Sequence, residues 1–197
     1  MPIDFERERI HDPIHGSINL SEIETKVVNS ASFQRLRKLK QLGLADYVFP
    51  GSTHSRFAHS IGALHIVSRM IDVVNKKHKK RFSKVLFGQT VKQKIRLAAL
   101  LHDIGHLPLS HAMESPIRRM LREEKDEDFE TETDVENATS FFGPLDHMAN
   151  AELDDKFKHE RFGAGLLMKR PDLKEALSGF NYRNEIGKTF AGDYPAF

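Results

Sequence analysis

Apolar residues recur at helical spacing over most of the chain, after a short stretch in which they alternate with polar residues. The alternating stretch, residues 10–20, contains Pro13 and Gly16, which predicts a turn with short strands, as in a hairpin. Helical spacing then predicts helices over 21–42 (with a break near 29–32), 56–75, 92–104 and 158–169. No repeated alternation of strand and helix is present. The pattern therefore predicts a mostly α-helical domain.

The chain changes character after residue 124. Ser110 is a candidate N-cap for a helix over 111–123. Residues 125–157 are polar and acidic and contain Gly143-Pro144, which predicts a long loop or an insertion with one short helix near Phe141. Pro171 interrupts the last helical stretch, and the final twenty residues lack an apolar closing segment. We therefore expect three parts, 1–124, 125–157 and 158–197, the last of them truncated.

Composition excludes several classes of protein. The 197 residues include no cysteine, which rules out disulfides and thiolate metal sites. No apolar run approaches the length of a membrane span, and residues 1–10 are too charged for a signal peptide, so we expect a cytoplasmic protein without a membrane partner. The charge is uneven, with a basic block from Lys76 to Lys84 and an acidic stretch from Glu123 to Glu136. Solvated surface is the first interpretation of both, and nucleic-acid or polyphosphate binding by the basic block is the alternative.

A His-Asp pair at the end of an apolar helix is the most informative chemistry in the chain. His102 and Asp103 follow Leu97-Ala98-Ala99-Leu100-Leu101, and His106 and His111 come shortly after them. Neighbours on a helix point about 100° apart, so both reach one ion only if it lies over the helix end. His59, near the start of another helix, is a candidate third ligand. Taken singly, a His-Asp pair is common and His59 could be a capping or core residue; the combination predicts a metal site.

The ligand types limit the choice of metal. Imidazole and carboxylate together suit Mn²⁺, Fe²⁺, Co²⁺ or Zn²⁺, whereas Mg²⁺ prefers oxygen ligands and keeps its waters. Three protein ligands leave positions for water and for a substrate oxygen, which is typical of a catalytic rather than a structural site. The sequence therefore predicts a metal-dependent hydrolase, or part of one.

Six motifs occur in order between residues 10 and 114. They are Asp12-Pro13-Ile14-His15-Gly16, Phe33-Gln34-Arg35-Leu36-Arg37, Lys40-Gln41-Leu42-Gly43, Tyr47-Val48-Phe49-Pro50-Gly51, Arg56-Phe57-Ala58-His59-Ser60 and the stretch from His102 to His111. As an ordered set they resemble the deoxynucleoside triphosphate (dNTP) triphosphohydrolases of the HD superfamily, and Lys158-His159-Glu160 resembles a later motif. The resemblance implies an all-α HD-domain helical bundle with a small N-terminal β-hairpin. Residues 1–124 would be the first part of that domain, and 158–197 its continuation.

The resemblance also implies an activity and residue roles. A metal-bound water would attack the α-phosphorus of a dNTP, releasing deoxynucleoside and inorganic triphosphate. A histidine near neutral pKa suits protonation of the leaving oxygen. The implied roles are metal binding by His59, His102 and Asp103; proton donation by His111, oriented by Glu114; phosphate contact by His106, His159 and Arg56; and sugar contact by Gln41 and Leu42. Each role has a structural alternative. Arg56 could be an ordinary arginine at the start of a helix, and Gln41 could face solvent. Glu114 could simply interact favourably with the helix dipole in the first turn.

Two departures from the family pattern affect these expectations. The family has one more metal-binding aspartate well after the His-Glu motif, and neither Asp172 nor Asp193 has its context. Vertebrate members bind a guanine nucleotide between subunits and form tetramers. Gln34 and Arg37 match that allosteric site, but Asn29 stands where the aspartate that contacts guanine would be. An amide offers only one acceptor where a carboxylate offers two, so we expect guanine activation to be absent or altered. The resemblance still implies a homo-oligomer, either a dimer or a tetramer.

Two other functions remain open from the sequence. An HD hydrolase of nucleoside monophosphates, cyclic nucleotides or alarmones would use the same metal site. A non-catalytic nucleotide- or nucleic-acid-binding module would use the basic block and lose affinity steeply with salt. The native metal and the preferred base are not determined by the sequence.

Overall fold

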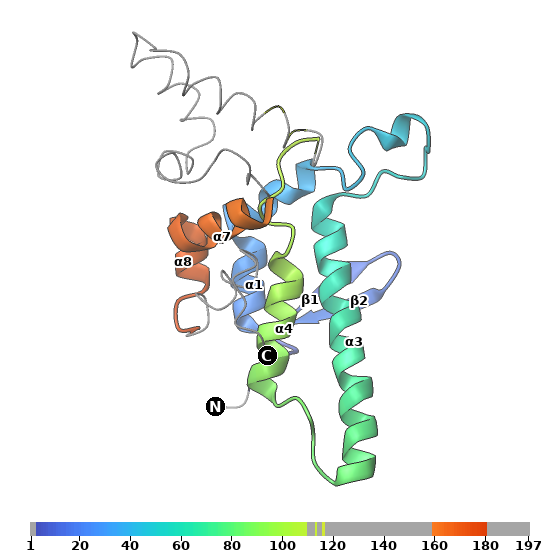
Figure 1. Cartoon of the computed structure of the whole chain (residues 1–197), viewed down its shortest axis with the longest axis vertical. Coiled ribbons are helices and arrows are strands. Elements are labelled where there is room, and N and C mark those ends of the chain that lie inside the picture. Colours follow the sequence, from blue (N-terminus) through green and yellow to red (C-terminus); the bar gives the residue numbers. More distant parts are fainter. Residues whose placement is uncertain (1–2, 110–112, 114–115, 117–158, 181–197) are drawn as a thin grey trace.

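Two short antiparallel strands begin the fold in the computed structural model, which describes residues 3–109, 113, 116 and 159–180 (Figure 1). Strands β1 (Glu8–Asp12) and β2 (Gly16–Leu20) pair in register from Glu8 opposite Leu20 to Asp12 opposite Gly16. The Asp12 carboxylate accepts from the backbone N–H groups of Ile14 and His15 at 2.9 and 2.8 Å. Gly16 has a φ of 73°, which glycine adopts without strain. The expected N-terminal hairpin is confirmed.

Three short helices follow the hairpin: α1 (Glu22–Asn29), α2 (Ala31–Gln34) and the 3₁₀ helix η1 (Arg35–Lys38). Ser30 separates the first two, because its backbone is extended and its hydroxyl caps α2 at the N–H of Phe33. The break expected near 29–32 is therefore present. The helical stretch ends at Lys38 rather than at 42, since Leu39 is extended. A further 3₁₀ turn, η2 (Ala45–Tyr47), lies in the loop that follows.

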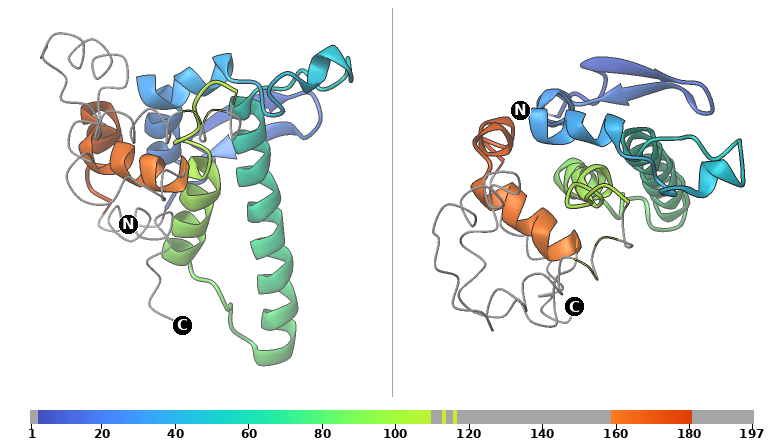
Figure 2. Two further views of the ribbon diagram at one scale, coloured as in Figure 1. Left: turned by 45° about the horizontal axis from the view of Figure 1, so that its top comes forward. Right: turned by 90° about the horizontal axis from the view of Figure 1, so that it is seen from above.

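The two longest helices, α3 (Arg56–Phe82) and α4 (Gln89–Leu101), run side by side (Figures 1 and 2). Helix α3 starts as predicted, with the Ser55 hydroxyl capping it, but continues seven residues past the predicted end at Asn75. It stops where Ser83 adopts a left-handed conformation with φ 57°. Helix α4 begins before the predicted Lys92 and gives way to a turn after Leu101. That turn carries the His-Asp pair.

Helices α7 (His159–Lys169) and α8 (Pro171–Ala176) complete the described fold. Helix α7 ends at Lys169, so the interruption predicted at Pro171 is present, and Pro171 then occupies the first turn of α8. The Asp172 carboxylate accepts from Ser32 N–H and Oγ at 2.7 and 3.1 Å, which joins α8 to α2. The predicted helix over 111–123 and the loop over 125–157 lie outside the described residues, apart from Met113 and Pro116.

One apolar core lies between these elements. The largest fully buried side chains are Ile18, Leu20, Phe33, Leu36, Ile61, Leu64, Leu97, Leu100, Leu101, Ile104, Leu167 and Leu173. They come from β2, α2, η1, α3, α4, the turn after α4, α7 and α8, so distant parts of the chain share one core. By length and composition alone α3 could also cross a membrane. Its Phe57, Ile61 and Leu64 nevertheless belong to this core.

A buried ion pair connects the hairpin to three helices. The Glu24 carboxylate is fully buried and accepts from Arg96 Nε at 2.8 Å and Nη2 at 2.7 Å. The same guanidinium donates to the backbone oxygen of Asn19 and to the hydroxyl of Ser68. Glu24 also accepts from Gln93 and from the Ser21 N–H, completing a capping box at α1. Each charge is thus paired and hydrogen-bonded, as burial requires.

Replacing Glu24 with Gln should lower the free energy of unfolding by about 3 kcal/mol, because it leaves the Arg96 charge buried without its carboxylate. Urea unfolding followed by circular dichroism measures this. Glu22→Gln is the matched control, since Glu22 pairs with Lys26 on the exposed surface of the same helix. The control should change stability by no more than about 0.5 kcal/mol. Equal effects of the two substitutions would contradict a structural role for the buried pair.

Replacing Gly105 with Ala should destabilise the fold by about 1–3 kcal/mol, since α7 packs directly on this residue. A Cβ at Gly105 would lie 1.9 Å from the His159 carbonyl oxygen and 2.4 Å from the backbone nitrogen of Gly163. Gly51→Ala is the control, because nothing lies within 4 Å of its Cβ position. Thermal unfolding of the two variants provides the comparison. An unchanged melting temperature for Gly105→Ala would show that α7 does not approach the turn this closely.

Candidate metal centre

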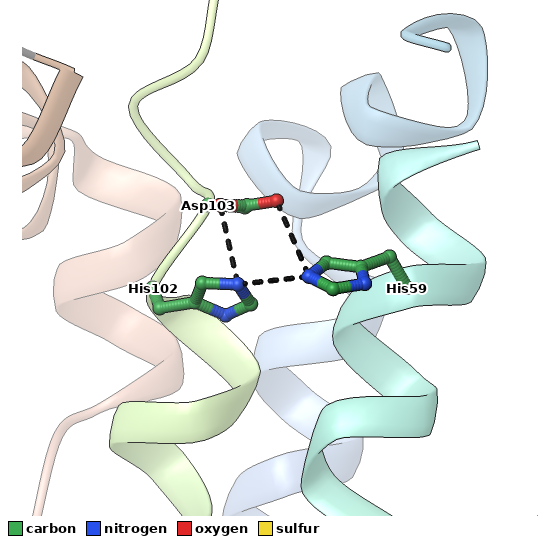
Figure 3. A group of neighbouring side chains, drawn as sticks. All are labelled: His59, His102 and Asp103. Atoms are coloured by element: carbon green, nitrogen blue, oxygen red, sulfur yellow. Dashed lines mark hydrogen bonds and ion pairs between the residues drawn. The ribbon is translucent and has the colours of Figure 1, made fainter. Parts of the chain in front are cut away.

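His59 and His102 face each other from two helices (Figure 3). His59 lies in the first turn of α3, and His102 follows the last residue of α4. Their Nε2 atoms are 3.1 Å apart, and both side chains are partly exposed. The side-by-side packing of α3 and α4 thus brings together two imidazoles that are 43 residues apart.

Asp103, which is buried, completes this cluster. One of its oxygens lies 3.2 Å from His102 Nε2, and the other lies 3.8 Å from His59 Nε2 (Figure 3). Arg56, one turn before His59 on α3, donates from Nη1 to the Asp103 carboxylate at 2.6 Å. Both partners of this pair are buried, with 3% and 4% of their surface exposed. Arg56 therefore sets the position of the carboxylate.

The electrostatics of the cluster keep Asp103 ionised. Burial by itself raises the pKa of this carboxyl group, but the charges of His102 and Arg56, with His106 and His59, outweigh it and lower the pKa below its usual range. Burial lowers the pKa of His59, and the attraction of Asp103 offsets this only in part. A carboxylate and a neutral imidazole are the protonation states that metal ligands need.

Backbone contacts orient the imidazole of His102. Its Nδ1 lies 2.8 Å from the carbonyl oxygen of Ala99. A carbonyl oxygen only accepts, so Nδ1 is the donor in this contact, and Nε2 is the ring atom that faces His59 and Asp103. Such a hydrogen bond to the far ring nitrogen is common for histidines that bind metals.

The spacing of these three side chains fits a divalent ion. The ligand atoms of His59, His102 and Asp103 all lie within 4.8 Å of one another. Ligands that each lie about 2.1 Å from one ion are themselves about 3 Å apart, close to the measured separation of the two Nε2 atoms. The predicted ligands therefore converge on one point, and their chemistry suits the metals expected from the sequence.

A second group adjoins the first at Asp103. His106 is buried, and its ring stacks on that of His159 with centroids 3.7 Å apart. His106 Nε2 lies 3.5 Å from an oxygen of Asp103, and ligand atoms of the three residues again lie within 4.8 Å of one another. Helix α7 reaches this position because Gly105 and Gly163 lack side chains at the contact. The structure thus brings His106 and His159 together beside the predicted metal ligands.

Arg35 holds the turn that carries these groups. Its Nη1 donates to the backbone oxygen of His106 at 2.6 Å, and its Nη2 donates to the backbone oxygen of Ile104. Burial, together with the charge of Arg170, lowers the pKa of Arg35 to about 10, so the guanidinium stays charged near neutral pH. This contact was not anticipated from the sequence. Arg35 was part of a recognised motif, but its long-range partners depend on tertiary packing.

The predicted substrate residues lie around the cluster. Arg56 Nη2 donates to the backbone oxygen of Gln41 at 3.3 Å, so Gln41 adjoins the Arg56–Asp103 pair. The buried Gln41 Oε1 has no hydrogen-bond partner among the described residues. Leu42 is 52% exposed. The predicted proton donor His111 and its partner Glu114 lie outside the described residues. Their roles, and the phosphate contact expected of Arg56, stay predictions.

The predicted allosteric residues also meet, away from the metal ligands. Arg37 Nε donates to Gln34 Oε1 at 2.7 Å, and Gln34 Nε2 donates to the backbone oxygen of Val28 at the same distance. The Arg37 guanidinium stacks over the Phe57 ring at 3.6 Å from its centroid. The structure therefore brings Gln34 and Arg37 together, and nucleotide binding there stays a prediction.

Several known proteins are similar in sequence to this chain. The chain is 40% identical over 106 residues to a deoxynucleoside triphosphate triphosphohydrolase SAMHD1 homolog of Dictyostelium discoideum, covering 54% of this chain and 20% of that protein. It is 35% identical over 115 residues to the deoxynucleoside triphosphate triphosphohydrolase SAMHD1 of Homo sapiens, covering 58% and 18%. An uncharacterized protein of Methanocaldococcus jannaschii is 40% identical over 105 residues, covering 53% and 20%. The chain thus spans about a fifth of the length of these relatives.

A comparison with models of protein families assigns the chain to a family. The model described as HD domain matches residues 56–178, which is more than half of the chain. The match begins at Arg56 and includes His59, His102 and Asp103, the three residues that the fold brings together. On the matched residues and the helical architecture, the chain belongs to the HD domain family.

Proposed function

We propose that this chain forms the metal-binding part of a phosphohydrolase that cleaves dNTPs to deoxynucleoside and inorganic triphosphate. The observation that carries the proposal is the convergence of His59, His102 and Asp103 on one point, with Arg56 buried behind the carboxylate. Two of the relatives reported above have names that state this activity. Because the aligned region includes only a fifth of those proteins, the substrate of this chain rests on the proposal.

His59, His102 and Asp103 would hold a divalent ion, which supplies a Lewis acid and lowers the pKa of bound water. Mn²⁺, Fe²⁺, Co²⁺ and Zn²⁺ match the mixed donor set, and Mg²⁺ matches it less well. Asp103 contributes the negative charge of the set. Arg56 is a positioning residue, because its hydrogen bond directs the carboxylate toward the two imidazoles.

The neighbouring histidines supply proton and charge chemistry. His106 and His159 stack beside Asp103, where imidazole N–H groups would donate to phosphate oxygens. Loss of the 5′ oxygen from phosphorus produces an alkoxide, which needs a proton. We assign that proton to His111, with Glu114 orienting it, as general acid catalysis would require. Gln41, whose backbone oxygen accepts from Arg56, and its chain neighbour Leu42 would contact the sugar.

Assembly and location belong to the same proposal. The expected dimer or tetramer would bind a nucleotide beside Gln34 and Arg37, whose side chains already meet. A cytoplasmic location accords with the absence of cysteine.

The metal and the substrate are tested together. The chain should bind about one Mn²⁺ in titration calorimetry, and His102→Ala should weaken binding by more than about 100-fold, because it removes a direct ligand. His54→Ala is the control, since exposed His54 lies outside both clusters. With Mn²⁺ present, the full-length protein incubated with a nucleotide panel should yield inorganic triphosphate from dNTPs. Turnover of monophosphates, cyclic nucleotides or alarmones instead would contradict the substrate, and metal binding without any turnover would favour a binding module.

The positioning role of Arg56 has a separate test. Arg56→Met should reduce Mn²⁺ affinity about 10–100-fold, the usual cost of losing a partner that orients a metal ligand. It should also lower stability by about 3 kcal/mol, since Asp103 is left buried without its guanidinium. Arg69→Met, at an exposed position of the same helix, is the control for the loss of charge. Unchanged metal affinity in a folded Arg56→Met protein would remove Arg56 from the site.

A further inference from the structure

The corner between α3 and α4 carries a dense positive charge. We define this α3–α4 corner as residues 76–87, which include six basic residues: Lys76, Lys77, Lys79, Lys80, Arg81 and Lys84. All six are exposed, and the chain contains no Asp or Glu between residues 73 and 102. The corner lies at one end of the long axis of the molecule (Figures 1 and 2). Its charge therefore faces solvent, and the nearest acidic residue before it, Asp72, pairs with Lys92.

Large apolar side chains are exposed at the same corner. Phe82, Val85 and Leu86 are 53%, 51% and 51% exposed. Just before the corner, Val73 and Met70 on α3 are 52% and 60% exposed. Apolar residues scattered singly over a surface are ordinary, but here they are grouped among cations at a protruding end.

Polar side chains hold this corner in shape. Asn75 Oδ1 accepts from the backbone N–H groups of Leu86 and Phe87 at 3.1 and 2.8 Å, and its Nδ2 donates to the backbone oxygen of Phe87 at 2.9 Å. His78 Nδ1 contacts the backbone oxygen of Lys84 at 2.8 Å. These bonds attach the loop to α3, and the side chains of Val85 and Leu86 remain exposed to solvent. A preformed surface loses little entropy on docking.

We propose that the α3–α4 corner docks on the surface of an anionic phospholipid membrane. The cations would attract the headgroups, and Phe82, Val85 and Leu86 would enter the boundary between headgroups and acyl chains, as amphipathic basic segments do. A nucleic acid would use the cations but offers no apolar phase for the aliphatic pair. A second copy of the corner would bring like charges together, which opposes self-association through this surface.

This contact would leave the metal centre open to solvent. His59 lies near the start of α3 and Phe82 at its end. At 1.5 Å per residue, that separation is about 35 Å. The proposal therefore stands independently of the proposed enzymatic function. It differs from the expectation of no membrane partner, which rested on the length of apolar runs and not on which side chains are exposed.

Vesicle binding tests the proposal. The chain should sediment with phosphatidylserine-containing vesicles and not with pure phosphatidylcholine, and it should dissociate as salt rises. Lys79→Ser/Lys80→Ser/Lys84→Ser should weaken binding about 100-fold, at roughly fivefold per cation. Val85→Ser/Leu86→Ser keeps the charge and should weaken it about tenfold. Lys169→Ser/Lys174→Ser and Ile14→Ser are the matched controls, because these exposed residues lie on other elements.

Tryptophan fluorescence reports the depth of the contact directly. The chain contains no tryptophan, so Leu86→Trp introduces a single indole at the corner. Its emission should shift to the blue on anionic vesicles and be quenched by brominated acyl chains. Ile14→Trp, at the tip of the hairpin, should show neither change. Circular dichroism confirms that each variant is folded.

Three outcomes would overturn the proposal: no binding to anionic vesicles, binding that is insensitive to Val85→Ser/Leu86→Ser, or an unshifted Leu86→Trp spectrum on bound vesicles. A single-stranded 30-nucleotide DNA is included as a competitor. If the DNA binds more tightly than vesicles and Val85→Ser/Leu86→Ser leaves its affinity unchanged, the corner is a nucleic-acid surface instead.

Discussion

The buried pair of Arg56 and Asp103 is the interaction on which the candidate site depends. An ionised carboxylate with 4% of its surface exposed would be expensive without a partner, and Arg56 supplies that partner at 2.6 Å. A buried pair of this kind adds little net stability, because desolvation of both charges offsets their attraction. Its effect is on position: the carboxylate is directed toward His59 and His102. The first turn of α3 and the turn after α4 must therefore keep a fixed position relative to each other.

Other contacts also hold the turn after α4 in this position. Arg35 from η1 donates to two carbonyl oxygens in the turn after α4, which holds the backbone that carries Asp103 and His106. Gly105 permits α7 to approach from the opposite side and place His159 against His106. The site is therefore assembled from four segments that are remote in the chain. Its geometry is a property of the packed domain and not of any one motif.

Helix α3 has different chemistry at its two ends. Its first turn provides His59, a candidate metal ligand, and Arg56, which pairs with the candidate ligand Asp103. Its last turns carry basic residues with exposed apolar neighbours, at the α3–α4 corner. The middle of the helix supplies Ile61 and Leu64 to the core. A single helix consequently separates the candidate metal centre from the proposed docking surface, so contact at one end does not cover the other.

The sequence by itself determined the helical class, the hairpin, the start of α3 and the three side chains that converge at the candidate metal centre, because periodicity, turn residues and local motifs are short-range properties. It also led to the HD assignment through the order of its motifs. It misplaced the end of α3, because residues 76–82 continue the helix and contain no local stop signal. It placed the break at Pro171 but did not show that a second helix begins there. Only the tertiary structure decided that Arg56 faces Asp103, that Arg35 and Glu24 have partners about 70 residues away, and that Val85 and Leu86 stay outside the core. Those outcomes depend on which surfaces pack together, and no pattern within a single segment contains that information.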